Sequence, residues 1–148
     1  MKQRLLCATD GSISSEKAVA WAVAFTKMLS TCGQEAELTF ITISAVSEEN
    51  TAKSHFWDTV TIDASNEQTY QELHGARVRA LKEGLEDVRL VTASGRNIAA
   101  AIIDFAETEK YDQIIMGCTG RTGVARVLLG SVASEVVTKA HCPVTVVR

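Results

Sequence analysis

The chain has 148 residues, enough for one domain with a sizeable hydrophobic core. Hydrophobic residues make up 46% and charged residues 22%, and the net charge of −3 comes without a basic run, which excludes a typical nucleic-acid-binding surface. No apolar stretch approaches the roughly 20 residues that span a membrane, so we expect no membrane insertion. The N-terminus reads as a strand and a turn rather than a signal peptide. We therefore expect a cytoplasmic protein whose four widely spaced cysteines stay unpaired.

The first third of the chain alternates apolar runs with one amphipathic stretch. Residues 4–10, RLLCATD, predict a buried strand that ends in a turn at DGS. A helix follows, with Ser12 or Ser14 as its N-cap, and Gly33 ends it. Residues 38–44, LTFITIS, are β-branched and predict a second strand. The side chains expected in the core from this helix are Ala18, Ala22, Phe25 and Leu29, with Trp21 beside them.

A long polar stretch, residues 44–66, interrupts the pattern. It is too long for a routine connection, so we expect either a mobile lid or a partly disordered segment. Within it, Phe56 and Trp57 could close over a ligand or pack on a partner. Residues 67–84 then predict a helix, and residues 88–93 predict a third strand. The apolar side of this helix is expected to consist of Leu73, Ala76, Ala80 and Leu81.

The last third continues the alternation. Residues 113–116 and 144–147 predict the fourth and fifth strands, and Pro143 stops the helix between them. The apolar residues that predict the third helix are Ile98, Ala101, Ile102, Phe105 and Ala106, and those of the last helix are Ala133, Val136, Val137 and Ala140. Strands and helices that alternate in this way predict one α/β domain over residues 1–148, a doubly wound parallel sheet with helices on both faces and right-handed connections.

Four of the nine glycines lie in the stretch MGCTGRTGVARVLLGS, from Met116 to Ser131. In an open α/β sheet, ligands bind outside the carboxyl ends of the strands, so this stretch and the ATDGS loop after the first strand are the two candidate sites. We expect Gly117 and Gly120 to adopt positive φ and to turn their N–H groups toward one point. Gly130 and Ser131 should begin the last helix, whose N-terminus can bind an anion such as phosphate.

Several of these residues also have an explanation without a ligand. The glycines could serve only as turns, and Ser131 could serve only as a helix N-cap. The stretch contains neither a P-loop nor the dinucleotide fingerprint. Asp10 could act as a general base or a metal ligand, or it could only cap the turn at GSIS; we favour a role in positioning a ligand. Arg121 and Arg126 could reach phosphates, or they could lie in solvent. We expect no catalytic residue among the three histidines, which share no recognisable constellation with a nucleophile.

The pattern Gly117-x2-Gly120-x9-Gly130-Ser131, followed by a helix and HCPVTVVR, resembles the ATP-binding branch of the universal stress protein family. The segments CATDGS and YDQIIMG fit the same family, and the resemblance covers nearly the whole chain except residues 44–66. It implies a Rossmann-like sheet of five strands in the order 3-2-1-4-5. It also implies bound ATP, with Mg2+ held mainly by the phosphates rather than by protein ligands.

The resemblance further implies which residues contact the nucleotide. The chain departs from the family at Ala8, where proline or valine is frequent, at Thr42, where histidine is common, and at Cys118, where serine is frequent. None of these changes removes a required phosphate donor. The implied nucleotide contacts are Ala8, Thr9, Asp10, Ile43, Met116, Gly117 and Val132, and the implied phosphate cradle is Gly120, Gly130 and Ser131.

The sequence PVTVVR forms an edge strand if the order is 3-2-1-4-5. A short, apolar, β-branched edge invites pairing with another chain, and a two-fold dimer in which the fifth strand pairs antiparallel with its copy closes that edge. The resemblance implies the same homodimer. The alternative is a monomer whose edge is covered by Arg148 or by a loop.

These observations favour a regulatory module of the stress response that binds ATP and signals to a protein partner. A slow ATPase or autophosphorylating enzyme would need a positioned base near the γ-phosphate, and the sequence offers no clear one. An enzyme that cleaves ATP to AMP and pyrophosphate carries an S-G-G-x-D-S loop, which TDGSIS imitates only in part. A phospho-acceptor receiver domain needs clustered carboxylates and a lysine, and only Asp10 is suitably placed.

Overall fold

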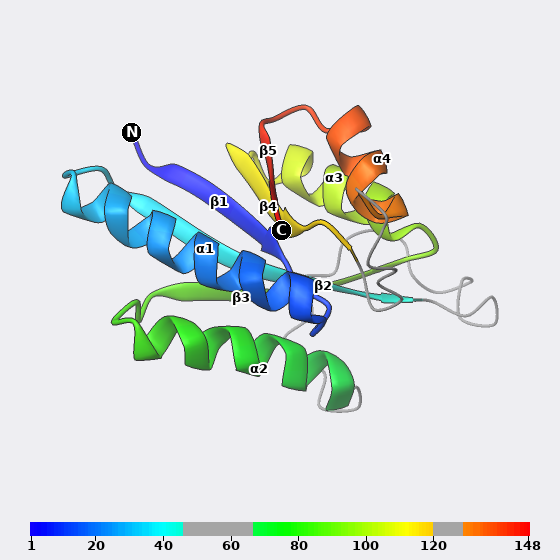
Figure 1. The fold of residues 1–148 in the computed structure, drawn as a ribbon. Helices are drawn as coiled ribbons and strands as arrows, with labels where there is room; N and C mark the ends of the chain where they lie inside the picture. The colour runs from blue at the N-terminus through cyan, green and yellow to red at the C-terminus, as the bar shows by residue number, and fades with distance from the viewer. Residues whose placement is uncertain (46–66, 120–128) are drawn as a thin grey trace.

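The computed structural model describes residues 1–45, 67–119 and 129–148. These residues form five strands and four helices that alternate along the chain (Figure 1). In chain order the elements are β1 (Gln3–Ala8), α1 (Ile13–Thr31), β2 (Ala36–Ala45), α2 (Glu67–Lys82), β3 (Val88–Gly95), α3 (Ile98–Thr108), β4 (Gln113–Gly117), α4 (Ser131–Lys139) and β5 (Val144–Val147). In this part of the chain no helix is long and apolar enough to cross a membrane.

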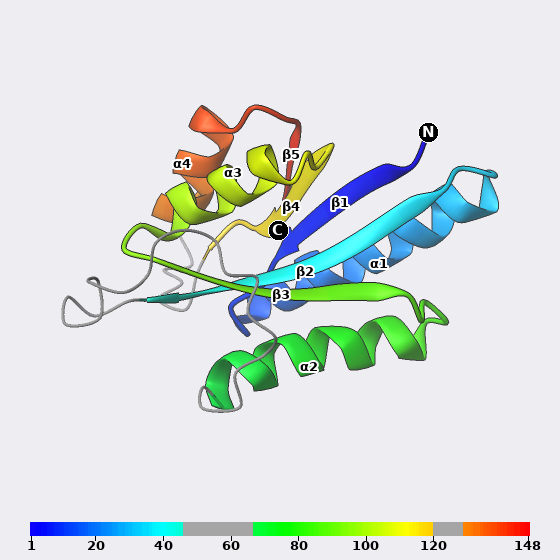
Figure 2. The same cartoon turned by 180° about the vertical axis from the view of Figure 1, so that it is seen from behind.

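The strands form one parallel sheet in the order β3-β2-β1-β4-β5, as the sequence predicted. Helices α1 and α2 cover one face and helices α3 and α4 cover the other (Figures 1 and 2). The strand order therefore reverses at β1, whose two neighbours are β2 and β4. In such a sheet the crevice for a ligand opens beyond the carboxyl ends of the strands at this reversal.

The core follows from the two-residue period of the strands. In β1, Leu5 and Cys7 point to the α1/α2 face and pack with Phe40, whereas Leu6 points to the α3/α4 face. All four of these side chains are fully buried. Because β1 is buried on both faces, its sequence is a continuous apolar run rather than an alternating one.

Local signals set the ends of α1. Ser12 is the N-cap, and its Oγ accepts a hydrogen bond of 3.2 Å from the N–H of Ser15. Glu16 lies in the first turn, where the helix dipole favours a negative charge. Gly33 follows the helix with a φ of +77°, a conformation that glycine adopts at no steric penalty. Ser12 and Gly33 thus confirm two positions that the sequence predicted.

Four apolar side chains expected in helix cores are exposed. They lie at the margins of the buried stripes or at helix ends, where the sheet no longer covers them. Ile98 is the first residue of α3 and Leu81 lies in the last turn of α2. Trp21 lies on the flank of α1 and stacks on Phe25 at 4.9 Å between ring centroids, instead of entering the core. The exposed fractions are 36% for Trp21, 44% for Leu81, 41% for Ile98 and 47% for Val137.

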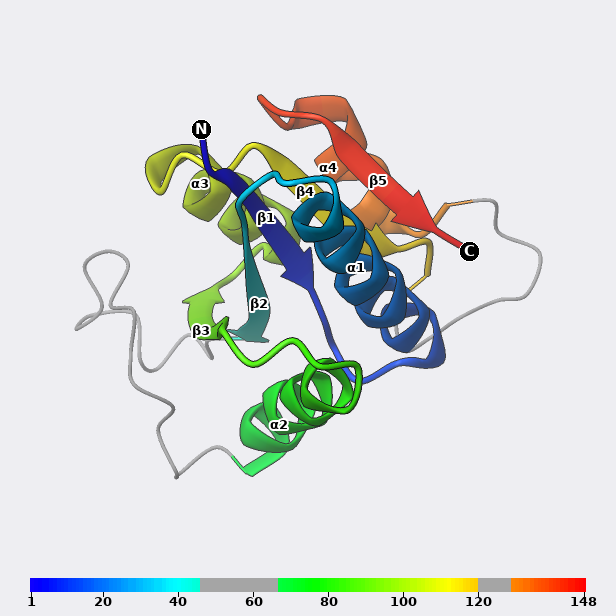
Figure 3. The same cartoon turned by 90° about the vertical axis from the view of Figure 1, so that its left-hand side faces the viewer.

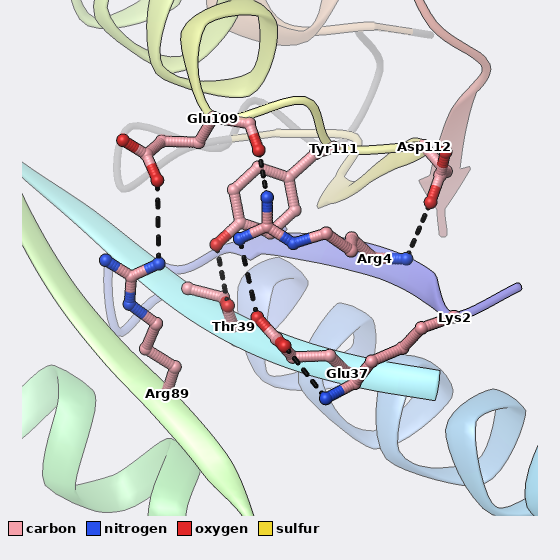
Figure 4. A network of polar contacts seen from close by, with 8 residues as sticks. All are labelled: Lys2, Arg4, Glu37, Thr39, Arg89, Glu109, Tyr111 and Asp112. Atoms are coloured by element: carbon pink, nitrogen blue, oxygen red, sulfur yellow. Dashed lines mark hydrogen bonds and ion pairs between the residues drawn. The ribbon is translucent and has the colours of Figure 1, made fainter. Parts of the chain in front are cut away.

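A polar network joins the elements at the amino edge of the sheet, opposite the expected site (Figure 4). The Arg4 guanidinium lies 4.6 Å from the centre of the Tyr111 ring, donates to the backbone oxygen of Glu109 and pairs with Glu37. The Tyr111 hydroxyl donates to Thr39 Oγ1 at 2.8 Å in the buried interior. These contacts fix the turn before β4 against β1 and β2.

Several sequence expectations fall outside the described residues. These residues are Phe56 and Trp57 of the long polar stretch, and Gly120, Arg121 and Arg126 of the glycine stretch. Strand β2 extends to Ala45, so Ser44 belongs to a strand and not to the irregular stretch that the sequence predicted to begin there.

Candidate functional site

The candidate site lies where β1 loses its neighbours at its carboxyl end. The β1–β2 pairing ends at Ala8 and Ile41, and the β1–β4 pairing ends at Cys7 and Ile115. Strand β2 continues with β3 as far as Ala45. Beyond Ala8, therefore, the chain runs between two diverging strands, and the loops after β1 and β4 face each other there. This is the strand reversal at which open α/β sheets bind ligands.

The loop after β1 is held by its own side chains. The N–H of Thr9 donates to the Ile41 carbonyl at 2.9 Å, and its Oγ1 donates to Ser15 Oγ at 3.3 Å. Asp10 Oδ1 accepts the N–H of Ser12 at 2.9 Å. This contact is the turn-capping role that the sequence offered as the alternative for Asp10. The role of Asp10 toward a ligand stays a prediction.

Gly117 does not adopt the positive φ that we expected from it. It is the last residue of β4, and the first turn of α1 passes directly over it. A Cβ at this position would lie 2.4 Å from Ser14 Oγ and 2.7 Å from both the backbone carbon and oxygen of Ser14. Packing of α1 on β4 is therefore sufficient to require glycine here, with or without a ligand.

The glycine stretch is anchored at both of its described ends. The N–H of Cys118 donates to the carbonyl of Val147 in β5 at 3.0 Å. The carbonyl of Cys118 accepts the N–H of Gly130 at 2.6 Å. The Gly130 N–H is consequently engaged by the protein, so the amide donors for an anion must come from residues further along the helix.

Gly130 and Ser131 begin helix α4, as the sequence predicted, but Ser131 does not serve as its N-cap. Gly130, not Ser131, is the N-cap, and it offers no side-chain acceptor to the first turn. Ser131 is the exposed first residue of the helix. The N–H groups of Ser131, Val132 and Ala133 precede the first intrahelical bond, which joins the N–H of Ser134 to the Gly130 carbonyl. These three N–H groups and the Ser131 hydroxyl lie at the N-terminal end of the helix, which is the end that attracts anions.

Helices α1 and α3, whose N-caps also lie among the described residues, have side chains that accept an N–H of their first turn. Ser12 caps α1, and Asn97 Oδ1 accepts the N–H of Ala100 at 2.9 Å in α3. Of the three, only α4 starts without a side-chain cap.

The apolar members of the expected site belong to one core cluster. Ala8, Ile43 and Val132 are half-buried and pack against the core on the α3/α4 face. Met116 is only 5% exposed, so its side chain supports the site from below and only its backbone can touch a ligand. The structure thus brings together Ala8, Ile43, Met116 and Val132 from four separate elements.

A second side of the site was missed by sequence reasoning. Thr42 Oγ1, nearly fully buried, donates at 2.7 Å to Glu72 Oε2 on α2. The Glu72 side chain also lies against Gly11, whose φ is +76°. Glu72 and Gly11 line a groove of about 1050 Å³ between α1 and α2, and Thr9 and Asp10 line the same groove. No local sequence pattern connects Glu72 to this edge, because the contact depends on how α2 returns to the sheet.

The described residues contain no cluster of three His, Cys, Asp or Glu side chains that could hold a metal ion. All four cysteines are free thiols, as predicted. Burial raises the pKa of Cys7 far above its usual value and also raises that of Cys142, so both remain protonated at neutral pH. His74 stacks on Tyr70 on α2, at 5.5 Å between ring centroids.

The described residues form an open, doubly wound α/β domain in which the N-terminus of α4 has no side-chain cap. The chain belongs to the universal stress protein family, whose sequence model matches residues 1–148. The universal stress protein YxiE of Bacillus subtilis is 28% identical over the full length of both chains. The universal stress protein MJ0531 of Methanocaldococcus jannaschii is 58% identical over 50 residues, which are 34% of this chain and 29% of that protein.

Two solved structures show the same fold. The protein MJ0577 of Methanocaldococcus jannaschii superimposes with a TM-score of 0.75 at 26% identity, covering 98% of this chain and 94% of that one. A universal stress protein in complex with cAMP superimposes with a TM-score of 0.72 at 27% identity, covering 99% and 97% of the two chains.

Proposed function

We propose that this protein is a regulatory module that binds an adenine nucleotide, physiologically ATP, at the carboxyl edge of the sheet. The observation that carries the proposal is the start of α4, where Gly130 caps the helix without a side-chain acceptor and Ser131 adds a hydroxyl. A phosphate placed there would receive N–H donors and the positive end of the helix dipole. The related structure in complex with cAMP supports an adenine nucleotide as the ligand class.

The apolar side of the crevice fits the base of such a ligand. Ala8, Ile43 and Val132 present half-buried aliphatic surface beside Thr9 and Asp10. Gly117 would contribute backbone only, since its Cα faces α1. Mg2+ would neutralise charge between the phosphates and would be held mainly by them.

We further propose that the bound nucleotide acts as a signal to a protein partner in a stress response rather than as a substrate in rapid turnover. Among the described residues, His141 pairs with Glu107 and His74 stacks on Tyr70, so neither histidine is engaged at the start of α4. We place this role in the cytoplasm, because four free thiols suit a reducing compartment.

We also propose that the protein forms a two-fold dimer through β5. This strand ends the sheet next to β4, and its outer edge carries backbone groups that the described residues leave without a strand partner. Antiparallel pairing of β5 with its copy would close both edges in one continuous sheet.

Titration calorimetry with ATP, ADP, AMP and cAMP, each with and without Mg2+, tests the ligand. We expect ATP to bind and Ser131→Ala to weaken it several-fold, the value of about one hydrogen bond. Ser134→Ala, one turn further along the exposed side of the same helix, is the matched control and should bind as wild type does. Equal loss in both variants, or no binding of any nucleotide, would refute the site.

Separation of the products after incubation with ATP tests the signalling role. Unchanged ATP supports it. ADP or labelled protein would instead identify a slow ATPase or an autophosphorylating enzyme. AMP with pyrophosphate would identify an enzyme that cleaves ATP between its α- and β-phosphates. A Mg2+-dependent rate on the order of 10 s⁻¹, typical of enzymes, would refute a regulatory module.

A further inference from the structure

We infer that Trp21, on the flank of α1, is a docking site for the C-terminal Arg148 of a second copy of this chain. The inference rests on the proposed pairing of β5 but concerns a surface that the pairing itself does not explain. Trp21 is a large aromatic side chain that stacks on Phe25 and is still about one-third exposed. Isolated exposed apolar residues need no explanation, but this one borders an open sheet edge.

The flank that carries Trp21 faces β5. Ser14 lies on it and touches Gly117 and Cys118 at the end of β4, the neighbour of β5. Trp21 follows Ser14 by seven residues, which is nearly two helical turns, and so lies on the same flank. The opposite flank faces α2, since Lys27 pairs with Glu83 just beyond that helix at 3.9 Å.

The heights of Trp21 and β5 along the sheet can be matched. Helix α1 runs antiparallel to the strands, with its first turn beside the C-terminal end of β5 (Figure 3). Ser14 is level with Gly117, which is in register with Val147. From Ser14 to Trp21 the helix descends about 10 Å, and from Val147 to Val144 the strand descends about 10 Å. Trp21 therefore stands level with Val144, the first residue of β5.

An antiparallel pair of identical strands, centred on β5, places Val144 of one copy opposite Val147 of the other. The two-fold axis is perpendicular to the sheet, so both α1 helices stay on the same face. Trp21 of one copy is then level with Val147 and Arg148 of the second copy. A guanidinium over an indole ring is a favourable cation–π contact, and the symmetry makes it twice.

A dimer needs this extra surface. Stable interfaces bury at least about 1,000 Å² in total, which a strand of four residues cannot supply alone. The surface next to β5 on this flank of α1 carries three apolar side chains, Trp21, Phe25 and Met28, together with the exposed cation Lys17 one turn before Trp21. Arg148 of the second copy is the cation level with Trp21.

The test uses the variant Trp57→Phe, in which Trp21 is the only tryptophan. Its emission is followed with protein concentration, alongside sedimentation equilibrium for the mass. We expect the Trp21 emission to change at the concentration at which the dimer forms. Arg148→Ala should abolish this change and weaken self-association about 5- to 30-fold, the value of two exposed cation–π contacts. Leu81→Ser, which removes an exposed apolar side chain from α2, should alter neither measurement.

Other results overturn the inference and are distinguishable. If Arg148→Ala changes neither the affinity of the dimer nor the Trp21 emission, the docking site is refuted and the pairing of β5 is not. A protein that stays monomeric at micromolar concentration refutes both. Nucleotide binding measured by calorimetry on the same samples reports separately on the proposed function.

Discussion

Replacement of Gly117 by alanine separates a packing role from a ligand role for the first glycine of the motif. The added Cβ would lie 2.7 Å from the backbone carbon and oxygen of Ser14. Carbon atoms in contact need about 3.5–4.0 Å, so the first turn of α1 would have to move outward by about 1 Å. Overpacking of this kind costs about 1–3 kcal/mol, and here the obstacle is backbone, so we expect the upper end of that range.

Thermal unfolding measured by circular dichroism checks this value. A loss of about 3 kcal/mol corresponds to a Tm lowered by roughly 6–12 °C in a domain of this size. The control is Gly75→Ala in the middle of α2, where an added Cβ meets nothing within 4 Å. This substitution should raise stability by about 0.5–1 kcal/mol because alanine is the better helix former. The two substitutions are chemically identical, but their expected effects on the free energy of unfolding have opposite signs.

A second variant tests which atoms cause the clash. Ser14→Gly added to Gly117→Ala removes the contact with Oγ at 2.4 Å but leaves both backbone contacts. The double variant should therefore recover only part of the lost stability. If Gly117→Ala unfolds at the wild-type Tm but no longer binds ATP, the packing argument is wrong and the ligand role alone explains the glycine.

Three further substitutions test the rest of the structure. Lys2 and Arg4 lower the pKa of Glu37, so this pairing stabilises the fold above the unfolded-state pKa and is lost as pH falls through the lower folded-state value. Glu37→Gln should thus reduce the free energy of unfolding in urea by about 0.5–1 kcal/mol at pH 7 and leave it unchanged near pH 2; an equal effect at both pH values would contradict this. Tyr111→Phe removes the 2.8 Å bond to Thr39 and should cost about 1 kcal/mol in the same assay, and an equal further loss on adding Thr39→Val would argue against their coupling. Asn97→Ala removes the cap of α3 and should cost about 1 kcal/mol, whereas Asn97→Asp should retain most of the stability.

The sequence predicted the order of the elements because each buried strand and each amphipathic helix carries its own period. RLLCATD is apolar throughout because β1 is covered on both faces, and Ala101 to Ala106 repeat at helical spacing because α3 lies flat on the sheet. The pattern does not reveal how wide the covered stripe is. Trp21 and Val137 belong to these apolar patterns, yet their side chains are 36% and 47% exposed.

The sequence predicted where Gly117 and Gly130 lie, at the carboxyl edge of the sheet, but not their detailed contacts. It could not show that Gly117 faces α1, because that contact joins residues about 100 positions apart. The same holds for Thr42 and Glu72, which meet only because α2 returns across the end of β2. Long-range approach of this kind leaves no periodic signal in either segment.

The anchoring of the glycine stretch connects the two proposed surfaces. Cys118 accepts the N–H of Gly130, at the start of the proposed phosphate site, and donates to the carbonyl of Val147 in β5. The inner edge of β5 is thus bonded to the residue that holds α4 in place, and its outer edge is the one offered to a second copy. A ligand that shifts Gly130 relative to Cys118 would act on β5 through two hydrogen bonds. Linkage then requires reciprocity: whatever factor ATP adds to the dimer affinity, dimerisation adds to the ATP affinity. Equal ATP affinities below and above the dimerisation concentration would mean that these two bonds anchor the stretch without coupling the surfaces.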